Sequence, residues 1–171
     1  MCIRDSLDPL WHEQGCEPFL VRWLAVNQFP VIHVIREKVL DTYVSNLLAC
    51  RLQIWDAKDA TAAAGVTFRL DPIETKVEIQ RRIEQVQLVR ELLIPLNSME
   101  TIYESLVDQQ GNKLAQEFIS QLNRLLEQPS PWAFGNVAVA TRKMGRSAKQ
   151  LIENFAEVHG EIKSLAFPRA A

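Results

Sequence analysis

Glycine is scarce in this sequence, with six residues spread along 171 positions. Phosphate-binding loops and dinucleotide-binding fingerprints need two or three glycines at fixed, short spacings, so neither motif can be written here. The sequence also lacks a Gly-x-Ser-x-Gly motif, and no cysteine lies in a recognisable active-site context. These absences weigh against a nucleotide-dependent enzyme and against nucleophilic catalysis. We therefore expect a protein that is not an enzyme and that needs no cofactor.

Cysteine is also rare, and Cys2, Cys16 and Cys50 are too few and too odd in number for a disulfide framework. Long apolar stretches are missing as well. The most apolar window, residues 19–35, is interrupted by Arg22 and other polar residues, so nothing reaches the roughly 18 uncharged apolar residues of a membrane span. We expect a soluble, cytoplasmic protein with no membrane span.

The chain has no large excess of charge, since its formal net charge is −2 and its pI is about 5.9. Binding to nucleic acid or to an anionic membrane would therefore have to come from a local basic patch. Hydrophobic residues make up 47% of the chain, which is enough to bury a core.

The first six letters, MCIRDS, look like an adapter-derived leader attached to genes predicted from environmental sequencing. We expect residues 1–6 to be non-native and residues 7–171 to form one all-helical domain, whose true N-terminus would be missing. We draw no functional information from residues 1–6.

Helical periodicity is clearest over residues 72–94. Asp71, Pro72 and Glu74 supply the N-cap, the first helical position and the capping-box partner. Apolar residues then recur on two opposite sides of the predicted helix. A helix that is apolar on two sides needs neighbours on both, so we expect residues 72–94 to form the central helix of a bundle.

A second long helix is predicted over residues 31–55, which contain neither glycine nor proline. The segment VIHVI at 31–35 is compatible with a strand, but the helical period continues through it. Residues 99–107 also show helical spacing, whereas residues 66–70 alternate like an extended connector. The expected fold is all-α, a single helical bundle of about six or seven helices with two long central helices, 31–55 and 72–94.

Three potential metal ligands, His33, Glu37 and Asp41, are spaced four residues apart. On a helix they would project from one side, and imidazole and carboxylate groups are suitable metal ligands. One helix rarely completes a metal site, so a solvated polar edge is the more ordinary interpretation. A metal-dependent enzyme at these residues is the third functional hypothesis.

The clearest basic cluster comprises Arg142, Lys143, Arg146 and Lys149, in a span from 128 to 152 that contains no acidic residue. Such a cluster beside a helix start can hold a phosphate backbone. Four cations are few, and no base-reading motif accompanies them. A nucleic-acid-binding accessory protein that uses residues 142–149 is therefore the second hypothesis.

The leading hypothesis is a non-enzymatic protein-interaction or assembly subunit, bound to a protein partner or to further copies of itself. Leu20 and Trp23 lie on a dense apolar side of a predicted helix that starts near residue 17. Arg90 falls within an apolar side of the 72–94 helix, where a guanidinium needs an internal carboxylate or carbonyl, or a partner chain. We take Leu20, Trp23 and Arg90 as the candidate interface residues, with internal pairing of Arg90 as the default.

Overall fold

The computed structural model describes residues 19–53, 65–107, 113–127 and 147–165. Within these ranges the chain forms six α-helices, one short 3-10 helix and two β-strands, so the fold is mixed α/β and the all-α prediction is wrong. The elements are α1 (Phe19–Val26), β1 (Val31–Ile35), α2 (Val39–Leu52), α3 (Pro72–Leu93), β2 (Ser98–Ile102), η3 (Tyr103–Ser105), α4 (Gln116–Leu125), α5 (Ala148–Leu151) and α6 (Phe155–Ile162).

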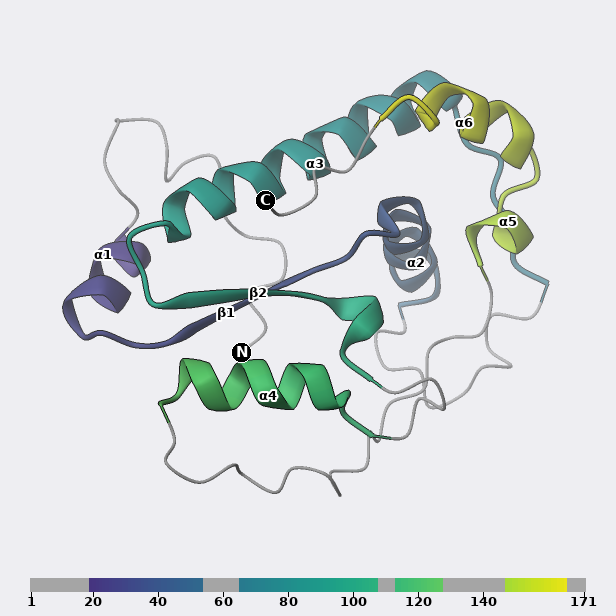
Figure 1. Ribbon diagram of the computed structural model, residues 1–171. Helices are drawn as coiled ribbons and strands as arrows, with labels where there is room; N and C mark the ends of the chain where they lie inside the picture. The colour runs from purple at the N-terminus through teal and green to yellow at the C-terminus, as the bar shows by residue number, and fades with distance from the viewer. Residues whose placement is uncertain (1–18, 54–64, 108–112, 128–146, 166–171) are drawn as a thin grey trace.

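The two strands pair in parallel, with His33 opposite Glu100 at the centre of the register. Both α2 and α3 lie in the connection between the strands, as a parallel pair requires a long crossover. Figure 1 shows α3 along one face of the sheet and α4 along the other. The sheet is therefore the layer that separates these two helices.

The strand β1 replaces the first part of the helix predicted over 31–55, and that helix begins only at Val39. Four of the five residues of β1 are β-branched, which favours an extended backbone. Pro30 stands directly before the strand and donates no hydrogen bond from its nitrogen. Helical spacing predicted the wrong structure here because the strand is stabilised by pairing with β2. That partner lies more than 60 residues further along the chain, so local spacing does not reveal it.

The helix predicted over 99–107 is also wrong, because Ser98–Ile102 forms β2 and Tyr103–Ser105 forms a 3-10 helix. By contrast, the prediction for 72–94 is confirmed to within one residue, as α3 spans Pro72–Leu93. The Asp71 carboxylate accepts hydrogen bonds from the backbone N–H groups of Ile73 and Glu74, both at 2.9 Å. These bonds satisfy two of the unpaired donors at the helix start.

The main core lies at the end of the molecule where β1 leads into α2. Side chains from α2, α5 and α6 meet there, and the extended residues 66–70 pack against them. Phe68 forms an isolated bridge with Ile152, with backbone bonds of 2.8 Å to Leu151 and Glu153. The buried members are Val44, Leu48, Ala148, Leu151, Ile152 and Val158.

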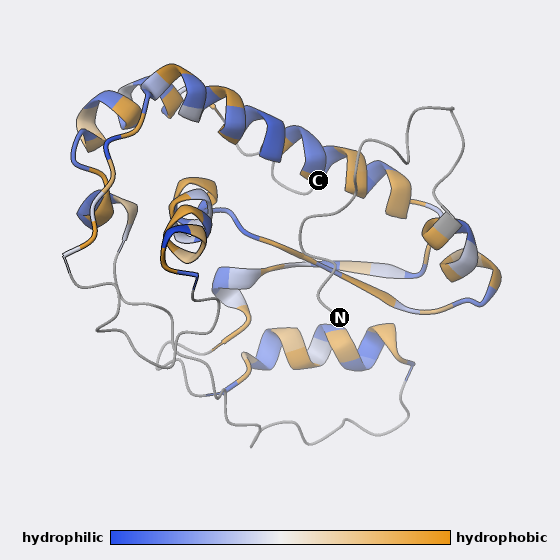
Figure 2. Ribbon diagram, turned by 180° about the vertical axis from the view of Figure 1, so that it is seen from behind, coloured by the Kyte–Doolittle hydropathy of each residue, from blue (hydrophilic) through white to orange (hydrophobic). Residues whose placement is uncertain are grey.

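The opposite end of the sheet is less covered. Figure 2 shows hydrophobic residues along α1 and β1, and α1 lies at the far end from α2, α5 and α6. No helix among the described residues is long and apolar enough to cross a membrane.

Candidate functional site

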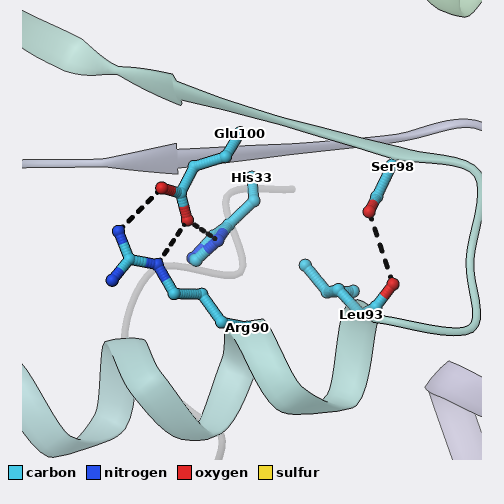
Figure 3. A network of polar contacts seen from close by, with 5 residues as sticks. All are labelled: His33, Arg90, Leu93, Ser98 and Glu100. Atoms are coloured by element: carbon cyan, nitrogen blue, oxygen red, sulfur yellow. Dashed lines mark hydrogen bonds and ion pairs between the residues drawn. The ribbon is translucent and has the colours of Figure 1, made fainter. Parts of the chain in front are cut away.

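A cluster of three ionisable side chains, His33, Arg90 and Glu100, lies between the sheet and α3. The Arg90 guanidinium donates to both carboxylate oxygens of Glu100, with Nε–Oε2 and Nη2–Oε1 distances of 2.7 Å. The His33 Nδ1 lies 3.2 Å from the same Oε2 atom. Figure 3 shows the strand residues His33 and Glu100 pointing toward Arg90 on α3. The internal pairing expected for Arg90 is thus confirmed.

The electrostatics of this cluster follow from burial and from one carboxylate that accepts hydrogen bonds from an arginine and a histidine. Burial lowers the pKa of His33, and together with the Arg90 charge it outweighs Glu100, which raises that pKa. The hydrogen bonds from Arg90 lower the pKa of Glu100. His33 is therefore neutral and Glu100 ionised at neutral pH, so the His33 Nδ1–H donates to a charged acceptor.

Chemically, the cluster ties α3 to both strands. The Glu100 carboxylate accepts from both of the other side chains, and its bidentate contact fixes the position of Arg90 over the sheet. Among the described residues, no three His, Cys, Asp or Glu side chains lie close enough together to hold a metal ion. The cluster supports a structural role better than a catalytic one.

The three predicted metal ligands do not share a helical face. His33 lies on β1, Glu37 lies in the loop that follows, and Asp41 lies in the first turn of α2. The Asp41 carboxylate accepts a 2.8 Å bond from the backbone N–H of Ala148 at the start of α5. Each side chain therefore has a different environment, because the helix that would have aligned them is absent from 31–38.

Five exposed apolar side chains, which we name together the α1–β1 patch, lie on the segment from α1 to β1. Trp23 and Phe29 lie with ring centroids 5.1 Å apart and are 44% and 45% exposed. Val26 ends α1, and Ile32 and Val34 lie on the face of β1 that points away from α3. The patch consists of Trp23, Val26, Phe29, Ile32 and Val34.

A hollow of about 630 Å³ lies beside this patch. Its walls come from the end of α1 with the following loop, the turn between α3 and β2, and the end of α4. Phe29 belongs to both the patch and the hollow. The lining residues are Leu24, Ala25, Gln28, Phe29, Pro30, Pro95, Leu96, Asn97, Leu125, Leu126 and Glu127.

Of the predicted interface residues, Trp23 is exposed, Leu20 is half-buried and Arg90 is paired within the chain. Sequence reasoning missed the other four members of the patch, which are Val26, Phe29, Ile32 and Val34. The β-branched residues at 31–35 could have indicated a strand. A strand turns alternate side chains to its two faces, so Ile32 and Val34 would then share one face.

The predicted nucleic-acid-binding cluster falls mostly outside the described residues. Arg142, Lys143 and Arg146 lie there, whereas Lys149 is exposed on α5. A contact between these four residues and phosphate stays a prediction.

No protein-family model matches this chain, and neither a curated protein nor a solved structure is significantly similar to it.

Proposed function

We propose that the protein is a non-catalytic interaction or assembly subunit, and that the α1–β1 patch is its binding surface. One observation supports this proposal above others. Eight large hydrophobic side chains are exposed in the described residues, and five of them lie between positions 23 and 34. Scattered exposed hydrophobic residues are ordinary, whereas gathered ones mark surfaces that another molecule covers.

The chemistry of the patch supports a protein partner. Two of its side chains, Trp23 and Phe29, are aromatic, and their ring centroids lie 5.1 Å apart. The centres of protein interfaces are rich in aromatic residues and poor in charged ones, and a few such anchors supply most of the binding energy. In the described part of the chain, His33, Arg90 and Glu100 are bonded to one another between α3 and the sheet, which favours a structural over a catalytic use of these side chains.

The test places a photoreactive amino acid at Val26 in one variant and at Val77 in a matched variant. Both valines lie on helices and are similarly exposed, at 74% and 65%, but Val77 lies on α3 outside the patch. Each variant is irradiated as purified protein and in the soluble fraction of the cells that encode it. Excess wild-type protein serves as the competitor.

We expect discrete cross-linked species from position 26, either to a second copy or to another protein, and we expect excess wild-type protein to suppress them. Position 77 should give little or none. Equal cross-linking from both positions would remove the special role of the patch. No cross-linking from position 26 in either sample would overturn the proposed function.

A further inference from the structure

The edge of β1 that does not pair with β2 carries backbone groups that a further strand could bond. The backbone N–H of Val31 donates to the Asn97 carbonyl at 2.9 Å, on the side of β2. Backbone groups of successive strand residues point to opposite edges, so Val31, His33 and Ile35 pair with β2, while Ile32 and Val34 point their N–H and C=O groups outward. The sheet order is β1–β2, and no described strand lies on that outer edge.

We propose that β1 pairs with β1 of a second copy of this chain, antiparallel and with the two-fold axis at His33. This inference rests on the proposed function and names the partner. In this register Ile32 lies opposite Val34 of the second copy, and Val34 lies opposite its Ile32. The two outward-pointing residues of each strand then exchange both of their backbone hydrogen bonds. The two sheets join into one sheet of four strands.

The hydrogen-bonding edge is self-complementary in this register, and it is less so in the register with the axis at Ile32. If the axis passed through Ile32, Val34 would lie opposite Pro30, whose nitrogen has no hydrogen to donate. Natural edge strands usually carry charges, prolines or bulges that block such pairing. The sequence VIHVI has none of these, and its only ionisable residue, His33, is turned toward α3 and bonded to Glu100.

Side-chain burial on the sheet supports the same contact. Met99 and Thr101 of β2 lie on the face that α4 covers, and Thr101 is only 8% exposed. Ile32 and Val34 lie beside them on the same face but are 39% and 45% exposed. Antiparallel pairing would set four β-branched side chains next to one another across the axis. Cross-strand pairs of this kind stabilise sheets.

Charge does not oppose this register. Arg36, the first charged residue after β1, falls opposite Pro30 of the second copy, and no like-charged residues face each other across the strands. The contact is small, because a stable interface usually buries about 800 Å² on each partner, and a five-residue strand covers less. We therefore expect a weak dimer with a dissociation constant on the order of micromolar.

The experiment is sedimentation velocity over a wide range of protein concentration, with the wild-type chain, Val34→Lys and Val77→Lys. Both variants add one charge at an exposed valine, but only Val34 lies on the open edge. We expect the wild-type chain and Val77→Lys to shift from monomer to dimer as concentration rises, and Val34→Lys to stay monomeric. Circular dichroism confirms that each variant is folded.

A wild-type chain that stays monomeric at every concentration would overturn the proposed dimer, as would a Val34→Lys variant that dimerises like the wild type. These results are distinct from failure of the proposed function. If the chain is monomeric but position 26 still cross-links to another protein, the patch binds a different partner through the same surface. If both experiments are negative, both proposals fail.

Discussion

Glu100 accepts bonds from side chains on two different elements, the Arg90 guanidinium on α3 and the His33 imidazole on β1, so its removal should be more costly than the loss of a surface ion pair. In Glu100→Gln, Arg90 keeps its charge in a site where its side chain is only 17% exposed. We expect the free energy of unfolding to fall by about 2 kcal/mol, between the values typical of surface and fully buried pairs. Urea denaturation measures this loss.

The matched control is Glu161→Gln, which removes an ion pair between Lys76 and Glu161 whose side chains are 40% and 48% exposed. We expect a change below about 0.5 kcal/mol there, because water screens such pairs. Equal effects of the two substitutions would contradict a structural role for the polar cluster.

His33 should make the stability of the protein depend on pH. Its pKa in the folded state is lowered from the ordinary value of 6.5, mainly by burial, so between these two values the unfolded chain binds more protons. The stabilising contribution is complete above pH 6.5 and is lost as pH falls toward the folded-state pKa. Urea midpoints near pH 7.5 and pH 5.5 should therefore differ less in His33→Gln than in the wild type. An unchanged difference would argue against this burial of His33.

At the scale of elements, the start of α3 offers a test of local sequence signals. Asp71→Ala removes the carboxylate that accepts from Ile73 and Glu74. We expect a loss of about 1 kcal/mol in the free energy of unfolding, the usual value of an N-cap. Asp71→Asn should retain most of that energy, because its side-chain oxygen still accepts the bonds. A similar loss in both variants would mean that charge, rather than capping, stabilises the start of α3.

The contrast between α3 and β1 explains how much of the fold the sequence predicts. The start of α3 depends on residues next to one another, so Asp71 and Pro72 were sufficient to predict it. The strand β1 depends on Ser98–Ile102, far away in sequence, and its β-branched residues are also compatible with a helical period. Helical spacing at 31–55 therefore predicted a helix where residues 31–35 form a strand.

The same reason limits prediction of the site. A buried arginine needs a partner, so internal pairing of Arg90 followed from the sequence, but Glu100 as that partner did not. Glu100 faces Arg90 only because β2 runs back along α3. Likewise, exposure of Ile32 and Val34 follows from α4 covering β2 and leaving the outer face of β1 open, an arrangement that no local pattern specifies.

At the scale of the whole molecule, stability should depend on the core formed by α2, α5 and α6, which is at the other end of the sheet from α1. Leu48 is 2% exposed in this core. We expect Leu48→Ala to lower the free energy of unfolding by about 3 kcal/mol, through lost burial and a residual cavity. Ile94→Ala, at a site that is 79% exposed, should change it by less than about 0.5 kcal/mol. Comparable losses would contradict the position of the core.

The central structural claim is that residues 31–35 form a strand with one edge bonded to β2 and the other edge unpaired by any described strand. Residue-resolved amide hydrogen exchange, measured by NMR at low protein concentration, tests this claim most directly. We expect slow exchange at His33 and Ile35, whose N–H groups face β2, and fast exchange at Ile32 and Val34, whose N–H groups face outward. Fast exchange through Val34 followed by continuous protection from Ile35 into α2 would instead indicate a helix, and would contradict the strand, the open edge and the surface built on it.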